Sequence, residues 1–160
     1  MKKLTVIVLC FLLLCGCSAP VKERTTKFYY CNASIDYEAG SRTIDSETRS
    51  IHWEEAPLET LQRYLAGPES ESLYSPFPAG LRVVSLRQDG DTLFATFSQE
   101  LSGLNGLALT QACCCITLTC IELTNTQTVT MDVENGLIGG QKSITMDQNS
   151  LLLTDYTAKG

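Results

Sequence analysis

The cysteines are the residues of this chain whose type and spacing could most readily support chemistry. Cys113, Cys114 and Cys115 are contiguous, Cys120 follows close behind, and Cys31 lies far upstream. Zinc sites usually take thiolates from Cys-x-x-Cys pairs, whereas contiguous cysteines on a helix point about 100° apart and converge poorly. Their odd number excludes a complete set of disulfides. Because a free thiol packs as a small hydrophobe, we expect core packing here and no metal site, with metal or redox chemistry as the alternative.

The single histidine, His52, would have to serve any mechanism of the Ser-His-Asp or Cys-His type. It lies beside Trp53 just before a predicted helix, a place typical of a surface or capping histidine. The sequence contains no Gly-x-Ser-x-Gly, no phosphate-binding loop and no His-Glu-x-x-His motif. We therefore predict no catalytic residues, no cofactor and no enzyme activity.

Acidic side chains are numerous, and two carboxylates at a suitable separation could hydrolyse glycan strands. Those near the middle of the chain fall at a helix start and in a loop, where solvated charge is the usual state. No two of them stand out as a converging pair, so a small hydrolase is kept only as a third functional class. The carboxylates concerned are Glu54, Glu55, Glu59, Glu69 and Glu71.

The N-terminus has the order of charge and hydropathy that defines a secretory signal. Two lysines precede an apolar stretch of about 11 residues, which is too short to span a bilayer comfortably because a spanning helix needs about 20 residues. The segment Leu14-Cys15-Gly16-Cys17 resembles the lipobox of bacterial lipoproteins. The sulfur of Cys17 would carry diacylglycerol and its new amine a further acyl chain, and two or three chains hold a protein at a membrane. We therefore predict a lipidated Cys17 on the extracytoplasmic face of the cell membrane, with a cleaved, secreted product as the alternative.

The charge balance argues against two kinds of partner. The chain has 12 basic and 18 acidic residues, a net charge of −6, and loss of Lys2 and Lys3 with the signal would make it more acidic. Nucleic acid and anionic lipid both require neutralising cations. We therefore expect no nucleic-acid partner and attachment to the membrane through the lipid alone. A hydrophobic content of 44% is enough to build one core.

The first half of the domain is predicted to contain a strand pair and a helix. Residues 28–31 are aromatic and strand-like, and a second strand over 43–51 follows the turn signal at 39–41. Pro57 suits a first helical turn, and Gly67-Pro68 stops the helix. The expected apolar stripe of this helix is Leu58, Leu61 and Leu65, with Glu59 and Arg63 as an ion pair on the opposite side.

The second half is predicted to contain a hairpin, a helix and a strand. Segments 81–88 and 92–97 flank Asp89-Gly90-Asp91, a strong hairpin turn. A helix over 104–123, with Asn105 as its cap, precedes a strand over 126–133. Since each helix has one apolar stripe, the economical fold is α+β: a small mixed sheet with two helices packed on one face, preceded by the strand pair. The stripe of the second helix is Leu109, Cys113, Ile116, Cys120 and Leu123.

An aromatic loop connects the first helix to the hairpin. It carries Tyr74 and Phe77, with Pro76 and Pro78 beside them. Stiff loops with aromatic side chains often bind partners, but the same rings could pack against the core. Both interpretations of Tyr74 and Phe77 remain open at this stage.

Taken in order, these segments resemble the GerMN domain family, which is named for sporulation and spore-germination lipoproteins of Gram-positive bacteria. The resemblance covers roughly residues 27–155 and rests on LQRYLAGP at 61–68, LYSPFPAG at 73–80, FSQEL at 97–101 and TVTMDVENG at 128–136. The cysteine-rich second helix departs from the family pattern, and the chain has one copy of the domain where some relatives have two. The resemblance implies a wedge-like α+β module similar to those that build rings in secretion-type assemblies, and it carries over no catalytic residues.

These observations divide the chain into a signal peptide at 1–16, a lipidated N-terminus and tether at 17–27, a GerMN-like domain at 28–155 and a tail at 156–160. With the resemblance, they favour a non-catalytic, membrane-anchored interaction or assembly module of the cell envelope, acting in sporulation or spore germination. It would dock a protein partner or another copy of itself. The alternative is an envelope protein that recognises peptidoglycan, for which an aromatic-lined groove with converging polar groups would be expected.

The spacing of the lipobox makes the anchor testable. Cys17→Ala removes the sulfur that would carry lipid, so the protein is expected to leave the membrane fraction or to keep its signal uncut. Fractionation and mass spectrometry of the N-terminus measure both outcomes. A Cys17→Ala protein that is correctly processed and still membrane-bound would exclude Cys17 as the anchor.

Overall fold

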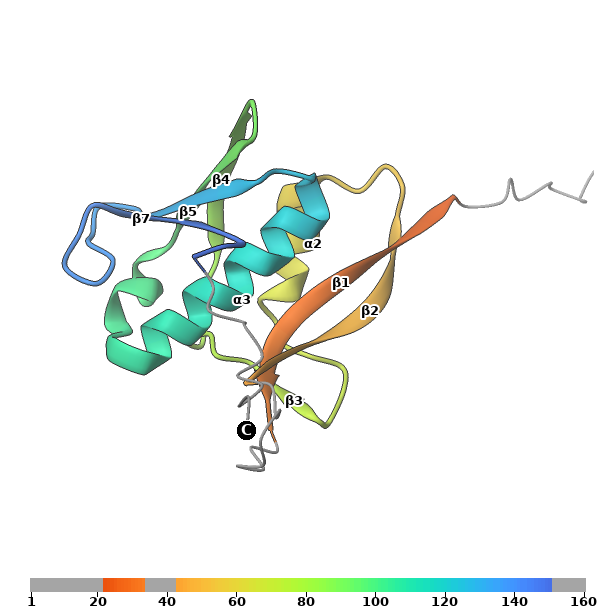
Figure 1. The fold of residues 1–160 in the computed structure, drawn as a ribbon, viewed down its shortest axis with the longest axis horizontal. Helices are drawn as coiled ribbons and strands as arrows, with labels where there is room; N and C mark the ends of the chain where they lie inside the picture. Colours follow the sequence, from red (N-terminus) through yellow and green to blue (C-terminus); the bar gives the residue numbers. More distant parts are fainter. Residues whose placement is uncertain (1–21, 34–42, 151–160) are drawn as a thin grey trace, which may run out of the picture.

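The computed structural model describes residues 22–33 and 43–150, which form an α+β fold of two sheets and two α-helices (Figure 1). Cys17, the turn signal at 39–41 and the end of the domain after residue 150 lie outside the described residues. The elements are β1 (Glu23–Asn32), β2 (Ile44–His52), α2 (Pro57–Tyr64), β3 (Leu73–Tyr74), β4 (Val83–Asp89), β5 (Thr92–Phe97), the 3₁₀ helix η1 (Gln99–Gly103), α3 (Gly106–Thr124), β6 (Thr128–Val133) and β7 (Ser143–Asp147).

The larger sheet is mixed and has the strand order β4-β5-β6-β7. Strands β5 and β6 are parallel, with Leu93 opposite Val129, whereas β4 and β7 pair antiparallel at the two edges. Parallel neighbours cannot be joined by a tight turn, so the chain crosses from β5 to β6 through η1 and α3. Helix α2 packs against β4, and α3 against β6 and β7. The buried face of the two central strands consists of Leu93, Ala95, Phe97, Val129, Met131 and Val133.

Both helices therefore pack on one face of a mixed sheet that follows a strand pair, as the sequence predicts. The strand pair does more than precede the sheet, because β1 and β2 join β3 in a second sheet of order β2-β1-β3. Strand β1 also lies against α3, which crosses the molecule with the two sheets on either side of it (Figure 1). Helix α3 is thus covered twice.

Double coverage explains the burial of α3. Its predicted stripe is buried throughout, and Asn105 occupies the N-cap, although without a side-chain capping bond. The prediction of a single stripe is nevertheless wrong, since the second sheet buries another side of the helix. By length and hydropathy α3 alone, among the described residues, could span a membrane, but here it is the core helix. The further buried residues of α3 are Ala112, Cys115, Thr117, Leu118 and Thr119.

The prediction for α2 is correct in position and partly wrong in its surface. Leu58 is exposed, whereas Tyr64 is completely buried, because α2 contacts β4 and α3 on the side that carries Tyr64. Arg63 pairs with Glu55, at 2.9 Å, instead of with Glu59. The carboxylate of Glu55 precedes the helix and also accepts a hydrogen bond from the Thr60 hydroxyl, so it is held within reach of Arg63.

The structure differs from the sequence prediction at one further boundary and in two additional strands. Strand β1 begins at Glu23, so residues 23–27 of the predicted tether belong to the fold. The predicted loop between α2 and the hairpin contains the short strand β3. No strand is predicted after residue 136, yet β7 pairs with β6, and the hydroxyls of Thr130 and Thr145 lie 2.9 Å apart. Both additional strands lie at the edge of a sheet.

The cysteines of α3 are mainly core residues, as predicted. Cys113, Cys115 and Cys120 are buried, and Cys114 is half-buried. Burial raises the pKa of both Cys113 and Cys120 to about 12, with a smaller contribution from Cys114 at Cys113. Thiols with so little thiolate at neutral pH react slowly with maleimides.

Adjacent cysteines on α3 provide a matched test of this packing. Cys113→Asp would bury an unpaired charge and is expected to lower the free energy of unfolding by about 3–5 kcal/mol. Cys114→Asp, one position along the helix at a half-exposed site, should lower the free energy of unfolding by clearly less. Chemical denaturation monitored by circular dichroism measures both, and equal losses would contradict the assignment of Cys113 to the core.

Candidate functional site

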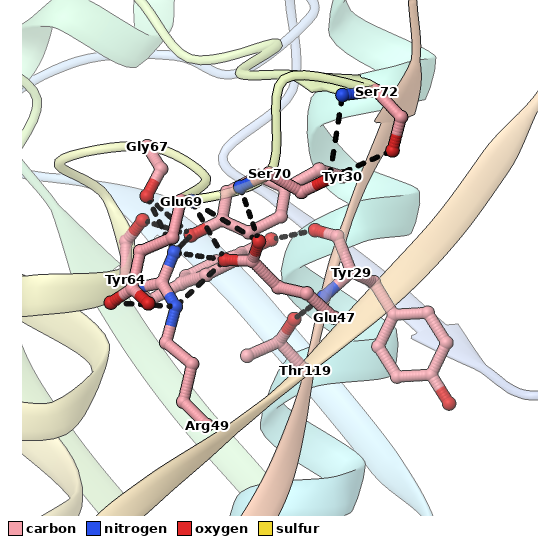
Figure 2. Close-up of polar contacts among 10 residues, drawn as sticks. All are labelled: Tyr29, Tyr30, Glu47, Arg49, Tyr64, Gly67, Glu69, Ser70, Ser72 and Thr119. Carbon is pink, nitrogen blue, oxygen red and sulfur yellow. Dashed lines mark hydrogen bonds and ion pairs between the residues drawn. The ribbon is translucent and has the colours of Figure 1, made fainter.

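A polar network joins β1, β2 and the segment that follows α2 (Figure 2). At its centre Arg49 and Glu47 form an ion pair, with their side chains only 10% and 12% exposed. The two residues lie two positions apart on β2, so they project from the same face of the strand. That face continues at Ile51, which is buried. A nearly buried charge pair at this place must be offset by further hydrogen bonds.

Arg49 and Tyr30 provide those bonds to the end of α2. The Nη2 group of Arg49 donates to the carbonyl oxygen of Gly67 at 2.7 Å and to the Tyr30 hydroxyl at 3.1 Å. The Tyr30 hydroxyl in turn lies 2.8 Å from the carbonyl oxygen of Tyr64 and 3.0 Å from that of Gly67. The last carbonyls of a helix have no partner within the helix. Tyr30 therefore caps α2 and Arg49 holds the turn that follows it, where Gly67 has a positive φ of +114°.

Glu47 holds the start of the following loop. Its carboxylate accepts hydrogen bonds from the backbone N–H groups of Glu69, at 3.0 Å, and Ser70, at 2.9 Å. Burial raises the pKa of Glu47, but the N–H of Glu69, the Arg49 guanidinium and the N–H of Ser70 together outweigh it and hold the pKa below its ordinary value of 4.5. The folded protein therefore stabilises the ionised form of the Glu47 carboxyl group. We call Tyr30, Glu47, Arg49 and Gly67 the clamp.

A cluster of aromatic rings packs against the clamp. The ring of Tyr64 lies 4.9 Å from that of Tyr30, 5.6 Å from that of Phe28 and 5.0 Å from that of Phe77, the last edge-on. The guanidinium carbon of Arg49 is 5.1 Å from the centre of the Phe28 ring. Stacked and edge-on ring pairs add stability beyond the area they bury. Contacts with this aromatic cluster therefore hold both the Arg49 guanidinium and the Phe77 ring in place.

The middle of β1 has no strand on the side away from β2, and side chains satisfy its backbone instead. The Thr119 hydroxyl of α3 accepts the N–H of Tyr29 at 3.0 Å, and the Tyr64 hydroxyl donates to the Tyr29 carbonyl at 2.6 Å (Figure 2). Buried backbone groups need such partners. These two contacts explain why a hydroxyl occurs at both positions inside the core.

The two candidate loop residues have different environments. Phe77 is half-buried and packs against the aromatic cluster, whereas Tyr74 is 40% exposed on β3. The side chain of Glu69 is 78% exposed, and Glu71 and Ser72 are exposed as well. We call Glu69, Glu71, Ser72 and Tyr74 the loop surface: it is acidic, carries one aromatic ring and rests on the clamp.

His52 lies apart from the clamp and the loop surface. It is exposed, and with Glu55, Glu59 and Arg63 it lines an open depression. This lining contains no Phe, Tyr or Trp ring and no serine or cysteine, and Glu55 is already bonded to Arg63 and Thr60. Among residues 22–33 and 43–150, no group of three or more His, Cys, Asp or Glu side chains could hold a metal ion. The aromatic-lined groove expected of a glycan-binding protein does not occur at this depression.

Sequence reasoning missed Glu47 and Arg49. The signal that could have found them is their alternation with Ile51 on β2, which places two charges on the inward face of a strand. The register confirms this face, since Glu47 lies opposite the buried Phe28. A charge on that face requires a buried partner.

Comparison with known proteins identifies similar sequences and folds. A family model described as "Sporulation and spore germination" (Germane) matches residues 27–138. The tandem GerMN domains of the sporulation protein GerM from Bacillus subtilis share the fold with a TM-score of 0.60 and 18% identity, over 76% of this chain and 44% of that one. The first GerMN domain of that protein has a TM-score of 0.58 and 17% identity, over 78% of this chain and 96% of that one. No curated protein sequence matches the chain. The GerMN resemblance drawn from the sequence is thereby confirmed.

Acid sensitivity is expected from the clamp. Because the pKa of Glu47 is depressed in the folded state, its stabilisation is full above about pH 4.5, the ordinary value, and is lost as the pH falls through the lower folded pKa. Glu47→Gln leaves Arg49 with only the exposed Glu69 carboxylate, 3.5 Å away, as a counter-charge and should lower the free energy of unfolding by about 1–3 kcal/mol at pH 7. Urea denaturation between pH 7 and pH 3 measures the difference.

Glu69→Gln is the control: this carboxylate also pairs with Arg49, but it is exposed to solvent, so its loss should change the free energy of unfolding by less than about 0.5 kcal/mol. The difference in the free energy of unfolding between wild type and Glu47→Gln should disappear at low pH. A difference that stays constant from pH 7 to pH 3 would show that the Glu47 charge does not stabilise the clamp.

Proposed function

The chain belongs to the sporulation and spore germination family described above, since its model matches residues 27–138, and from this premise we propose that the protein is a lipid-anchored, non-catalytic interaction module of the cell envelope. The observation that carries the proposal is the loop surface. It presents exposed carboxylates and one exposed aromatic ring on a segment that the clamp holds in place. Interaction surfaces use such prearranged aromatic anchors.

The proposed anchor would set the orientation of the domain. Lipidation at Cys17 leaves residues 18–22 between the lipid and the start of β1 at Glu23, a span of at most about 20 Å. Strand β1 then runs for 10 residues, roughly 33 Å of extended chain. Its far end pairs with β3 through Cys31 and Tyr74. The loop surface would thus face away from the membrane, toward partners in the envelope.

The chemistry of the loop surface supports a protein partner with basic character, or a basic face of another copy of this chain. Carboxylates in the rim of an interface mainly steer association and select partners, while a central aromatic ring contributes most of the binding energy. The role in sporulation or germination follows from the family, and the mechanism is placement: the lipid fixes the domain at the membrane and the loop surface binds.

Single substitutions in the loop separate binding from folding. Tyr74→Ala removes an exposed ring and should leave the melting temperature within about 2 °C of wild type, while reducing partner capture at least about tenfold. Phe77→Ala removes a ring packed on Tyr30 and Tyr64 and should lower the free energy of unfolding by about 2–3 kcal/mol. Photo-crosslinking from position 71 in membranes of sporulating cells, together with thermal melting, measures the two effects.

Trp53→Ala is the matched control, because Trp53 is an exposed aromatic at the opposite end of the strand pair, where its backbone N–H donates to the Lys22 carbonyl oxygen. Trp53→Ala should leave cross-linking unchanged. Equal capture by wild type and Tyr74→Ala would remove the loop surface as the binding site. A large fall in melting temperature for Tyr74→Ala would place that ring in the core.

A further inference from the structure

Three thiols gather where β1, β3 and α3 meet, apart from the cysteines of the main core. Cys31 of β1 and Cys115 of α3 are both completely buried and belong to one small cluster with Ile44 and Leu118. Cys114 is half-buried and packs against the same cluster. Their arrangement is built by the fold, because Cys31 lies more than 80 positions from Cys115 in the sequence. Simple core packing does not require thiols to meet in this way.

The register of β1 along α3 brings the two thiols together. The bond from the Tyr29 N–H to the Thr119 hydroxyl fixes one point of this contact. Two residues further along β1 cover about 6.6 Å, and four residues back along α3 cover about 6 Å. Cys31 therefore comes opposite Cys115 in one buried cluster, close enough for hydrogen bonding between the thiols to shift the pKa of each.

Tyr74 completes the site from the third element. It is the direct cross-strand partner of Cys31, and directly opposed residues bring their side chains within contact. Burial and hydrogen bonding to Cys31 raise the pKa of Tyr74, whereas hydrogen bonding to Gln111 of α3 lowers it, so the Tyr74 hydroxyl lies near both side chains. Because Tyr74 is 40% exposed, movement of this side chain would open an approach for a small reagent to Cys31 from the β3 side.

We propose that Cys31 and Cys115 are a redox-active pair that forms a reversible disulfide between β1 and α3, beneath the loop surface. The reaction is exchange with a low-molecular-weight disulfide, RSSR. The Cys31 thiolate attacks one sulfur of RSSR, forming Cys31–S–S–R and releasing RS⁻. Cys115 then loses its proton to a base and attacks the sulfur of Cys31, releasing the second RS⁻. Two electrons pass from the protein to RSSR, and the two protons end on two RSH molecules.

The electrostatics of the site support Cys31 as the attacking group. The hydrogen bond from Cys115 lowers the pKa of Cys31, burial raises it and the Tyr74 hydroxyl lowers it, with a net value of about 7. The same hydrogen bond and burial raise the pKa of Cys115. The titratable groups of the described residues that face Cys31 are thus Cys114 and Cys115 from α3 and Tyr74 from β3. An attacking thiol reacts fastest when its pKa lies near the ambient pH.

Mass spectrometry of the full-length protein tests the pair. The folded protein is treated with oxidised glutathione, digested with trypsin and analysed without reduction. The expected product joins peptide 28–42, which contains Cys31, to peptide 88–142, with the loss of two hydrogen atoms. Cys115→Ser should abolish this product, whereas Cys114→Ser, its matched neighbour, should retain it. The oxidised protein should also melt at a higher temperature than the reduced protein, because the bond closes a long loop.

Two results would overturn the proposal: no cross-link in folded wild type under conditions that oxidise the unfolded chain, or a cross-link that survives Cys115→Ser and disappears in Cys114→Ser. Tyr74→Phe keeps the ring but removes the hydroxyl. It should slow exchange roughly two- to fivefold at pH 7 and move the pH profile of the rate upward. An unchanged profile would exclude Tyr74 as a positioning residue for Cys31.

Discussion

The parallel pairing of β5 and β6 is the constraint on which the rest of the structure depends. Two parallel neighbours require a long crossover, and here the crossover is α3. Because α3 is apolar on more than one side, packing on the four-stranded sheet leaves part of it uncovered. Strands β1, β2 and β3 supply the second cover. The short second sheet is therefore a requirement of the core and not an appendage to it.

Covering α3 with the edge of β1 creates a second problem, which polar side chains solve. Backbone groups of β1 that have no neighbouring strand are bonded by Thr119 and Tyr64. Tyr64 lies at the end of α2, so α2 must be fixed at that position. Tyr30 bonds the Tyr64 carbonyl, and Arg49 bonds the Gly67 carbonyl in the turn that follows. The Gly67-Pro68 segment that marks the family in the sequence is thus part of a structural clamp.

Local patterns in the sequence were sufficient to predict most elements. The Asp-Gly turn, Pro57 at a helix start and the alternation of β6 each depend on neighbouring residues only, and each prediction is confirmed. The second sheet was partly missed, because β3 is two residues long and exists only through pairing with β1. Edge strand β7, which is five residues long and pairs with β6, was also missed. The pairing of Glu47 with the loop, and of Cys31 with Cys115, joins segments distant in the sequence, which periodicity within one segment does not report. Phe77 and Tyr74 occupy one loop, and only tertiary packing separates the core ring from the surface ring.

The course of β1 also has a mechanical consequence. A pull applied at the N-terminal end of β1 acts along the strand, and its antiparallel ladder with β2 runs from Glu23 to Cys31. Such a load is shared by many hydrogen bonds in shear, whereas a load across the ladder would open them one at a time. The contacts of β1 with α3 resist sliding in the same direction. A domain held by its first strand at one end and by a partner at the other would therefore transmit tension through its longest strand.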